Sequence, residues 1–381
     1  MEKFGLDEYE VFALLDELYA KDTQYKQVLS SMCTHPHSIA VKAHQQFISA
    51  NLGDPGLFAG TAEIEQKVIR LIGKLLHSED AAGYLTTGGT EGNIQAVRAA
   101  RNYRDVRKPN IIVSESAHFS FDKISDLLQV EVRKASVDEV LRVDAESVES
   151  LIDENTIALV GIAGTTEFGQ IDPIKELSDL SEEHGLFLHV DAAFGGFVIP
   201  FLDKHYDFDF SLSGVTSMVC DPHKMGFSTI PTGGLLFREN GFIQRLKTET
   251  PYLTSITQHS LVGTRSGASA AAAYAVMTHL GIAGYKKIVD YCMNLTSHLV
   301  TRVREIGIEP VIEPVTNVVV LNLPEVNYTR EKLYQKGWVT SITRKPVGMR
   351  LIMMPHVTET MLDAFISDLE KVVTSQDIRR H

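Results

Sequence analysis

The chain has 381 residues, of which 44% are hydrophobic and 22% charged, so it is long enough for two domains or for one large domain with a smaller one. Its formal net charge of −13 argues against a nucleic-acid-binding protein and leaves no basic face for anionic membranes. Three widely spaced cysteines fit reduced thiols in the cytoplasm, and neither a signal peptide nor a membrane-spanning apolar run is expected.

Strands alternate with helices over most of the chain. Helical spacing of apolar residues predicts a first helix over 7–20, and a Gly- and Pro-rich loop at 51–61 precedes a second helix over 62–77. A helix is also expected over 90–100, with further helical stretches between several of the strands. The strands are expected at 81–87, 110–116, 157–163, 186–191, 215–219 and 233–237. This alternation predicts a mostly parallel central sheet flanked by helices, in an α/β fold.

The last third of the chain has a different pattern. From about Ala268 it becomes helical and Ala-rich, and the tail carries expected strands near 316–323 and 348–354 and a final helix near 358–374. We therefore expect three parts, namely an N-terminal helical segment over 1–50, a large α/β domain over 51–270, and a small α+β domain over 271–381.

The stretch TTGGTEGN (86–93) follows a predicted strand and opens a predicted helix. Gly88 and Gly89 permit the backbone to approach an anion closely, while Thr90 can cap the helix beside free backbone N–H groups. The stretch is neither a Walker sequence nor G-x-G-x-x-G. It indicates a phosphate site, although a plain strand-to-helix turn would have the same composition.

Two polar residues lie where later strands end. His118 is at the edge where α/β sheets bind ligands, unless it is an ordinary capping or core-edge histidine. Asp191 ends a buried strand, where a carboxylate needs a cationic partner, and the small Ala193 after it would let a flat ring lie close. A metal site built on His189 and Asp191 is the alternative, but no third ligand is near in sequence, so no metal is expected.

Lys224 and His223 follow a further strand and a proline turn. A lysine removed from water at a ligand edge can act as a nucleophile toward a carbonyl, whereas a lone lysine in a turn is usually a surface residue. Together, however, a phosphate site, an imidazole, a buried carboxylate and a lysine at the strand ends of one sheet are the parts that pyridoxal phosphate needs. Lys224 would hold that cofactor as a Schiff base.

The motifs TTGGTEGN, SAHFS, GTTEFG, HVDAAFGG, DPHK and GTRSG stand in an order that resembles the pyridoxal-phosphate enzymes of fold type I. Within them the chain is similar to the group II amino-acid decarboxylases, and in particular to the archaeal L-tyrosine/L-aspartate decarboxylase family, which is related to sphingosine-phosphate lyase. The similarity runs from about Ser31 to the tail. It implies a pyridoxal-phosphate-dependent L-amino-acid decarboxylase, an amino acid as its small-molecule substrate, and a homodimer with active sites at the subunit interface, with neither nucleic acid nor membrane as a partner.

The resemblance implies a role in cofactor binding for residues at the strand ends. They are Gly89, Thr90 and His223 at the phosphate, His118 and Ala193 on the two ring faces, Asp191 at the ring nitrogen, Thr165 near the cofactor edge and Lys224 at the aldehyde.

Five residues from loops and from the small domain complete the implied site. Thr264 would reach the phosphate in the neighbouring subunit, and Tyr252, or else His118, would return a proton to the substrate α-carbon. Arg350 would bind the substrate carboxylate, unless it forms a structural salt bridge at the domain interface. Asn51 and His35 fall in segments that line the pocket in related enzymes.

The implied substrate is L-tyrosine, giving tyramine, with L-aspartate, giving β-alanine, as a second or rival substrate. In methanogens tyramine feeds methanofuran synthesis, and elsewhere β-alanine feeds coenzyme A synthesis. The candidate pocket segments THPHS and NLGDPGLF contain no Lys or Arg, which favours the aromatic substrate. The alternatives are a carbon–carbon lyase of the sphingosine-phosphate type, for which an N-terminal membrane anchor would be expected, and a non-catalytic binding protein on the same scaffold.

Overall fold

The computed structural model describes residues 3–380, with side chains as far as Ser375. Its central sheet has seven strands in the spatial order β1-β7-β6-β5-β4-β2-β3. In chain order these are β1 (Ala82–Thr86), β2 (Asn110–Ser114), β3 (Glu131–Ala135), β4 (Thr156–Ile162), β5 (Phe187–Asp191), β6 (Val215–Cys220) and β7 (Gly233–Phe237).

All strands of this sheet except β7 run in the same direction. The pairs β2–β3, β2–β4, β4–β5 and β5–β6 are parallel, while β7 is antiparallel to both β1 and β6. The carboxyl ends of β1, β2, β4, β5 and β6 therefore meet at one edge of the sheet, where α/β folds place their ligands.

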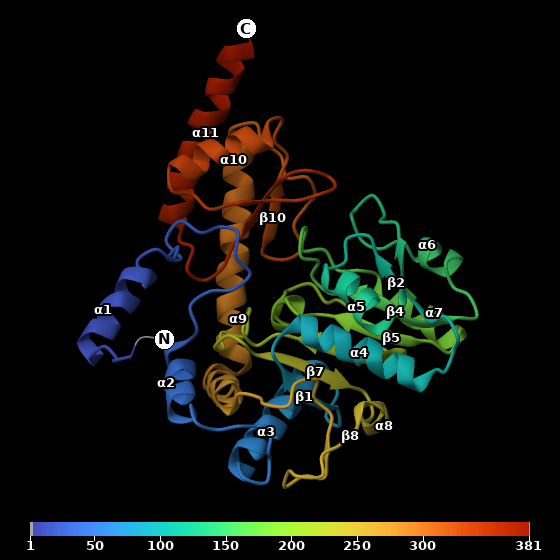
Figure 1. Ribbon diagram of the computed structural model, residues 1–381. Coiled ribbons are helices and arrows are strands. Elements are labelled where there is room, and N and C mark those ends of the chain that lie inside the picture. Colours follow the sequence, from blue (N-terminus) through green and yellow to red (C-terminus); the bar gives the residue numbers. More distant parts are fainter. Residues whose placement is uncertain (1–2, 381) are drawn as a thin grey trace.

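Helices cover both faces of the sheet (Figure 1). On one face, α4 (Gly89–Tyr103), α5 (Ser120–Leu128) and α8 (Asn240–Ile243) share an apolar core with the strands. On the other are α2 (Ser38–Gln46), α3 (Ala59–Leu75), α6 (Ala145–Ser150), α7 (Ile174–Glu183) and α9 (Gly267–Glu305). Short 3₁₀ turns, η1 (Gly195–Phe197), η2 (Ile199–Phe201) and η3 (Gln244–Leu246), follow β5 and α8.

The pattern of side chains explains which strands the sequence predicted. Because both faces are covered, β4 is buried at every residue and has a continuous apolar sequence. The edge strand β3 was not predicted, because its sequence, EVRKA, alternates weakly and carries charges that solvent accepts at a sheet edge.

The C-terminal part forms a smaller α+β unit. Its antiparallel sheet has the order β10-β12-β11, with β10 (Val318–Leu321), β11 (Ser341–Ile342) and β12 (Met349–Ile352). This sheet packs against α10 (Val326–Gln335), α11 (Glu359–Arg380) and the second half of α9. The N-terminal segment joins the unit, since the Ile352 N–H donates to the Leu29 carbonyl at 2.7 Å.

Helix α9 runs from the large unit to the small one (Figure 1). It crosses the boundary expected at residues 270 and 271 without interruption and is broken at Gly281, whose φ of 55° and ψ of −173° are not helical. The division of the chain into three parts stays a prediction.

Two peripheral elements have exposed apolar side chains. Helix α1 (Glu8–Tyr19) has no buried residue and lies apart from the main body in Figure 1. A hairpin of β8 (Thr248–Glu249) and β9 (Thr257–Gln258) carries the loop with Tyr252. Within the described residues, no helix is long and apolar enough to cross a membrane.

Candidate active site

A cavity of about 310 Å³ opens at the carboxyl edge of the sheet. It is lined by residues that follow β1, β2, β4, β5 and β6, including seven of those predicted to bind a cofactor. These seven are Gly89, Thr90, His118, Asp191, Ala193, His223 and Lys224. Among the described residues that line the cavity, Lys224 is the only lysine or arginine.

The turn between β1 and α4 forms a cradle that only glycine permits. Gly88 has a φ of +144°, which L side chains rarely adopt, and a Cβ there would lie 3.2 Å from Cε1 of His223. A Cβ on Gly89 would lie 3.0 Å from Cβ of Ala193 and 3.2 Å from Oδ2 of Asp221. No side chain of Gly88 or Gly89 therefore separates the start of α4 from the cavity, which suits an anion site, although the Gly89 N–H itself donates to the Asp221 carboxylate.

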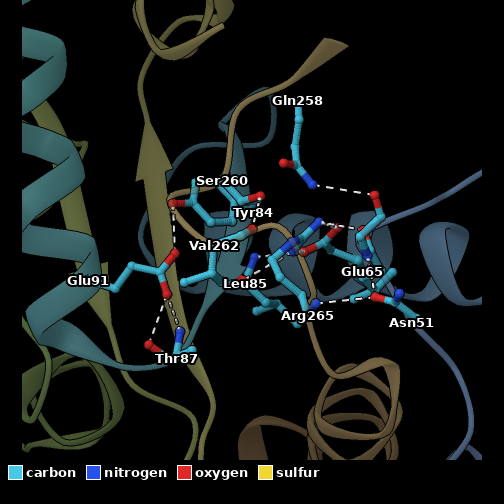
Figure 2. Close-up of polar contacts among 12 residues, drawn as sticks. Asn51, Glu65, Tyr84, Leu85, Thr87, Glu91, Gln258, Ser260, Val262 and Arg265 are labelled. Carbon is cyan, nitrogen blue, oxygen red and sulfur yellow. Dashed lines mark hydrogen bonds and ion pairs between the residues drawn. The ribbon is translucent and has the colours of Figure 1, made fainter. Parts of the chain in front are cut away.

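Glu91, in the first turn of α4, fixes the shape of this cradle (Figure 2). Its Oε2 accepts from the backbone N–H of Thr87 at 2.8 Å and from the Thr87 hydroxyl at 2.9 Å. Its Oε1 accepts from the Tyr84 hydroxyl at 3.1 Å. Both sides of the turn are thus held by one buried carboxylate.

A second polar cluster in Figure 2 joins β1 to the loop that precedes α9. Arg265 forms a buried ion pair with Glu65, whose Oε1 also accepts from the Leu85 N–H at 2.9 Å. Asn51 Oδ1 accepts from the backbone N–H groups of Gly53 at 2.8 Å and Arg265 at 3.2 Å. These contacts hold the loop that contains Thr264 at a fixed distance from the cradle.

Asp221 lies between the cradle and the cavity lysine. It is 1% exposed, and its Oδ2 accepts from the Gly89 N–H at 2.9 Å and lies 3.7 Å from Nζ of Lys224. Its Oδ1 is buried and has no hydrogen-bond partner among the described residues. Burial raises the pKa of Asp221, while the charges of Lys224 and His223 lower it.

His223 is oriented by its backbone contact. Its Nδ1 lies 2.6 Å from the Thr232 carbonyl oxygen and 3.3 Å from the Thr232 backbone nitrogen, so the Thr232 backbone holds the ring by this nitrogen. Its Nε2 lies 3.9 Å from Oδ2 of Asp221. The second ring nitrogen is therefore available on the cavity side.

Asp191 ends β5 at the floor of the cavity and is 7% exposed. Its Oδ1 accepts from the Ala193 N–H at 3.1 Å and its Oδ2 accepts from Nδ2 of Asn93 at 2.8 Å. Two fixed donors thus hold the carboxylate, which suits a cationic partner in the cavity.

His118 lies on the wall formed after β2. Its Nδ1 accepts from the Ser120 N–H at 3.2 Å. Burial is the largest influence and lowers its pKa, Asp191 raises it, and Lys224 lowers it. A flat, predominantly neutral imidazole at this place can stack on an aromatic ring.

Two predicted residues lie near the site but not in the cavity wall. Thr165 is fully buried, and its hydroxyl oxygen accepts from the Gln170 N–H at 3.0 Å, so the structure has Thr166 rather than Thr165 at the wall. Arg350 lies on β12, where its Nη1 donates to the Ser341 hydroxyl at 3.1 Å. Its guanidinium feels the charge of Glu167, so both interpretations of Arg350, the carboxylate ligand and the structural ion pair, stay predictions.

Four other predicted residues lie outside the cavity of their own subunit. Tyr252 is 85% exposed and Thr264 is also exposed, both on loops before α9. His35 is exposed, and its ring centre lies 4.7 Å from that of Tyr25. The side-chain oxygen of Asn51 accepts the loop hydrogen bonds described above (Figure 2).

Sequence reasoning gave no role to Asp221 or Asn93, although both stand in the motifs it used. Asn93 is 1% exposed and Asp221 is 1% exposed. A signal was present, because Asn93 lies one helical turn after Thr90 and so faces the same side of α4. Asp221 directly follows the last residue of β6, and Asp191 is the last residue of β5, so both carboxylates stand at strand ends.

The side chains fit the pyridoxal phosphate that the sequence resemblance implies. At the glycine cradle a Cβ would crowd His223 and Ala193, so the backbone there is left open to a ligand, and the buried Asp221 Oδ1 beside it has no hydrogen-bond partner among the described residues. A lysine, a neutral imidazole and a fixed carboxylate face the same 310 Å³ space. Such a set can bind an aldehyde, cover a ring and pair with a ring nitrogen.

Comparison with known proteins agrees with this chemistry. The profile described as "Pyridoxal-dependent decarboxylase conserved domain" matches residues 57–323. A protein of Methanothrix thermoacetophila named "Probable L-tyrosine/L-aspartate decarboxylase" is 59% identical over 371 residues, with 97% of each chain covered. A protein of Archaeoglobus fulgidus named "Probable L-aspartate decarboxylase" is 54% identical, over 94% of this chain and 99% of that protein.

Solved structures of two enzymes have the same fold. The sphingosine-1-phosphate lyase of Burkholderia pseudomallei aligns with a TM-score of 0.91 at 25% identity, covering 98% of this chain and 92% of that one. The glutamate decarboxylase of Lactobacillus brevis aligns with a TM-score of 0.90 at 22% identity, covering 98% and 94%. The predicted architecture of fold type I is confirmed.

Proposed function

The chain belongs to the pyridoxal-dependent decarboxylase family, and from that premise we propose that it converts L-tyrosine to tyramine and CO2, with L-aspartate as a second or rival substrate. It is a pyridoxal-phosphate-dependent carboxy-lyase. The observation that carries the proposal is the placement of Lys224, Asp191 and His118 around one cavity at the carboxyl edge of the sheet. That set also argues against a non-catalytic binding protein.

Different residues would bind different parts of the cofactor. Lys224 would hold it through its amine, the α4 N-terminus with Thr90 and His223 would hold its phosphate, and His118 would cover its ring. When bound, the cofactor supplies an electron-withdrawing ring that accepts the electrons released with CO2. Asp191 would keep the ring nitrogen protonated by charge pairing.

Substrate binding and the return of the proton involve residues outside this set. Arg350 is half-buried, and its Nε has no hydrogen-bond partner among the described residues. Burial lowers its pKa to about 10, against the opposing effect of the Glu167 charge. A guanidinium with an unused donor is a suitable partner for the substrate α-carboxylate. Tyr252, or His118 on the cavity wall, would then return a proton to the α-carbon.

The buried carboxylate of Asp221 should make the affinity for the cofactor depend on pH. A phosphate in the cradle approaches a carboxylate that already accepts from the Gly89 N–H, and the titratable side chains of Lys224, His223 and Asp191 lie near that carboxylate. Because burial raises the pKa of Asp221, lower pH favours its neutral form and reduces the repulsion, whereas higher pH increases it. Asp221→Asn should therefore bind phosphate-bearing ligands more tightly than wild type, by roughly 10-fold where Asp221 is ionised, and the difference should shrink as the pH falls and Asp221 becomes protonated.

Pyridoxine 5′-phosphate is the ligand for this measurement, since it lacks the aldehyde and its affinity does not depend on the Lys224 amine. Calorimetric titration of apoprotein would give the dissociation constants, with phosphate-free pyridoxine as the matched control. A variant-to-wild-type ratio that does not change with pH would contradict the role given to Asp221.

The choice of substrate is tested by a panel of amino acids with detection of CO2 and amine. The cavity wall contains no arginine among the described residues, which supports an aromatic side chain over a second carboxylate. A site that pairs the phenol hydroxyl should have a kcat/KM for tyrosine roughly 100-fold or more above that for phenylalanine, because a buried polar group would be left unpaired. If kcat/KM for aspartate exceeds that for tyrosine, the proposed preference for tyrosine is wrong, although the proposal that the protein is a decarboxylase is not affected.

The same panel addresses the lyase alternative. The Burkholderia structure shares the fold and a lyase of that type would share most cofactor residues. A phosphorylated long-chain amino alcohol should therefore be included, with detection of a released aldehyde. Aldehyde release without CO2 release from any amino acid would favour the lyase.

We propose a homodimer in the cytoplasm. The apolar residues of α1, among them Phe12 at 56%, Leu15 at 50% and Leu18 at 57% exposure, are covered by no described element of their own subunit, and a second copy would bury them. The exposed positions of Tyr252 and Thr264 are compatible with action in the neighbouring site. The free cysteines Cys33, Cys220 and Cys292 suit a reducing compartment.

A mixed dimer of two inactive subunits tests this shared site. Lys224→Ala paired with Tyr252→Phe should recover about half of the wild-type activity per dimer, because one of the two sites regains both groups. The mixed dimer should be purified with two different affinity tags and assayed for CO2 release. If purified mixed dimers stay inactive, Tyr252 acts in its own subunit or not at all.

A further inference from the structure

Four buried polar side chains form a row that leads away from the cavity. They run from Asp191 at the end of β5 through Asn93 on α4 to His189 on β5 and Ser217 on β6. Nδ2 of Asn93 lies 2.8 Å from Oδ2 of Asp191, Oδ1 of Asn93 lies 2.9 Å from Nε2 of His189, and Nδ1 of His189 lies 2.8 Å from Oγ of Ser217. Asn93 and His189 are each 1% exposed, so water does not compete for these contacts.

The direction of each hydrogen bond follows from its neighbour. A carboxylate only accepts, so the Asn93 amide must present its NH2 group to Asp191, and that group also donates to the Ser120 hydroxyl at 3.1 Å. The Asn93 oxygen then faces His189, whose Nε2 must carry the proton. If the imidazole is neutral, its Nδ1 accepts from the Ser217 hydroxyl.

His189 is neutral in this environment. Burial is the largest influence and lowers its pKa to about 4, with Asp191 and the Ser217 contact opposing that effect. Both ring nitrogens are engaged in hydrogen bonds, so neither has a free lone pair for a metal ion. The chemical use of this histidine is therefore to donate from Nε2.

We propose that Asn93 and neutral His189 are positioning residues that aim the Asp191 carboxylate at the cofactor's ring nitrogen. The inference rests on the proposed role of Asp191. The His189 N–H polarises the Asn93 amide, which makes the amide NH2 a stronger donor to Asp191. With the Ala193 N–H on the other oxygen, the carboxylate is held on both sides and cannot turn away from the cavity.

The wild-type protein provides the first test, and a variant serves only to assign the signal. Nitrogen-15 NMR of protein labelled in its histidines, with His189 assigned by its loss in His189→Gln, should show a neutral ring protonated at Nε2 from pH 6 to pH 9. An imidazolium, or the tautomer protonated at Nδ1, in that range would overturn the proposal.

Two variants of nearly equal volume provide the second test. His189→Gln keeps a donor that can reach Asn93, whereas His189→Met does not. We expect His189→Met to lower kcat by roughly 10-fold with KM little changed, and His189→Gln to recover most of that loss. In cofactor labelled with nitrogen-15 at the ring, the Met variant should shift the ring-nitrogen signal toward the unprotonated form and the Gln variant should not.

Thermal unfolding of both variants separates this effect from a packing defect. If Met and Gln variants of equal stability give the same ring-nitrogen signal and the same kcat, the positioning role is wrong. Asp191→Asn separates the role of His189 from that of Asp191. If the ring-nitrogen signal changes in Asp191→Asn but not in His189→Met, only the positioning role of His189 is wrong. If the signal does not change in Asp191→Asn, the proposed role of Asp191 is itself wrong.

Discussion

Lys224→Ala is expected to lower kcat for decarboxylation by a factor on the order of 1,000 or more, because the variant loses the amine that would hold the cofactor and exchange it with the substrate. Lys224 is the only lysine or arginine among the described residues of the cavity wall, so no neighbour can replace it. The measurement is single-turnover and steady-state CO2 release from the preferred amino acid.

Two controls make this result interpretable. Lys224→Arg keeps a positive charge near Asp221, whose Oδ2 lies 3.7 Å from the lysine Nζ, but guanidinium stays protonated and cannot attack an aldehyde. It should be as inactive as the alanine variant. Lys287→Ala removes an exposed lysine of α9 and should retain wild-type activity. Activity of Lys224→Ala within 10-fold of wild type would contradict the assignment.

Asp191→Asn is expected to lower kcat by roughly 100-fold or more while the cofactor still binds. The substitution keeps the size of the side chain but removes the negative charge that favours a protonated ring nitrogen, and each pKa unit lost there corresponds to about 1.4 kcal/mol. The phosphate cradle after β1 is untouched, so the affinity for the cofactor should change much less than kcat.

Asp191→Glu is the matched control for charge. It restores the negative charge but displaces it by one methylene group, so its kcat should fall between those of wild type and Asp191→Asn. The protonation state of the cofactor ring, followed by nitrogen-15 NMR, should change in the Asn variant and not in the Glu variant. Near-normal turnover in Asp191→Asn would exclude the proposed role in electron withdrawal.

Much of the large unit could be predicted because its central strands are buried on both faces and are therefore apolar. The strand over 157–163 and the strand over 233–237 are apolar throughout, since helices cover both faces of the sheet. The edge strand β3 (Glu131–Ala135) could not be predicted from its sequence, because its charged side chains are stabilised by solvent rather than by the core.

The candidate site was predictable to the extent that it lies at strand ends. His118, Asp191 and Lys224 follow different parallel strands, and the carboxyl ends of such strands meet at one edge. The positions of Asn93, one turn after Thr90, and Asp221, directly after β6, are visible in the sequence. Their partners, Asp191 and the Gly89 N–H, depend on contacts between α4 and the strand ends, which the sequence does not specify.

The residues that stayed outside the cavity have a different explanation. Thr165 and Thr166 are adjacent and chemically alike, so only the backbone direction after β4 decides which one faces the ligand. Tyr252 and Thr264 lie on exposed loops, and their use depends on a second copy of the chain, whose position a single sequence does not specify.

Borohydride reduction of the holoenzyme followed by peptide mapping tests the central claim most directly. The reagent fixes the cofactor to the lysine that holds it, whatever the substrate and whether or not the preparation is fully active. We predict one pyridoxyl group per subunit, on the peptide that contains DPHKMGF, at Lys224. A pyridoxyl group on any other lysine, with Lys224 unmodified, would contradict the account of the site.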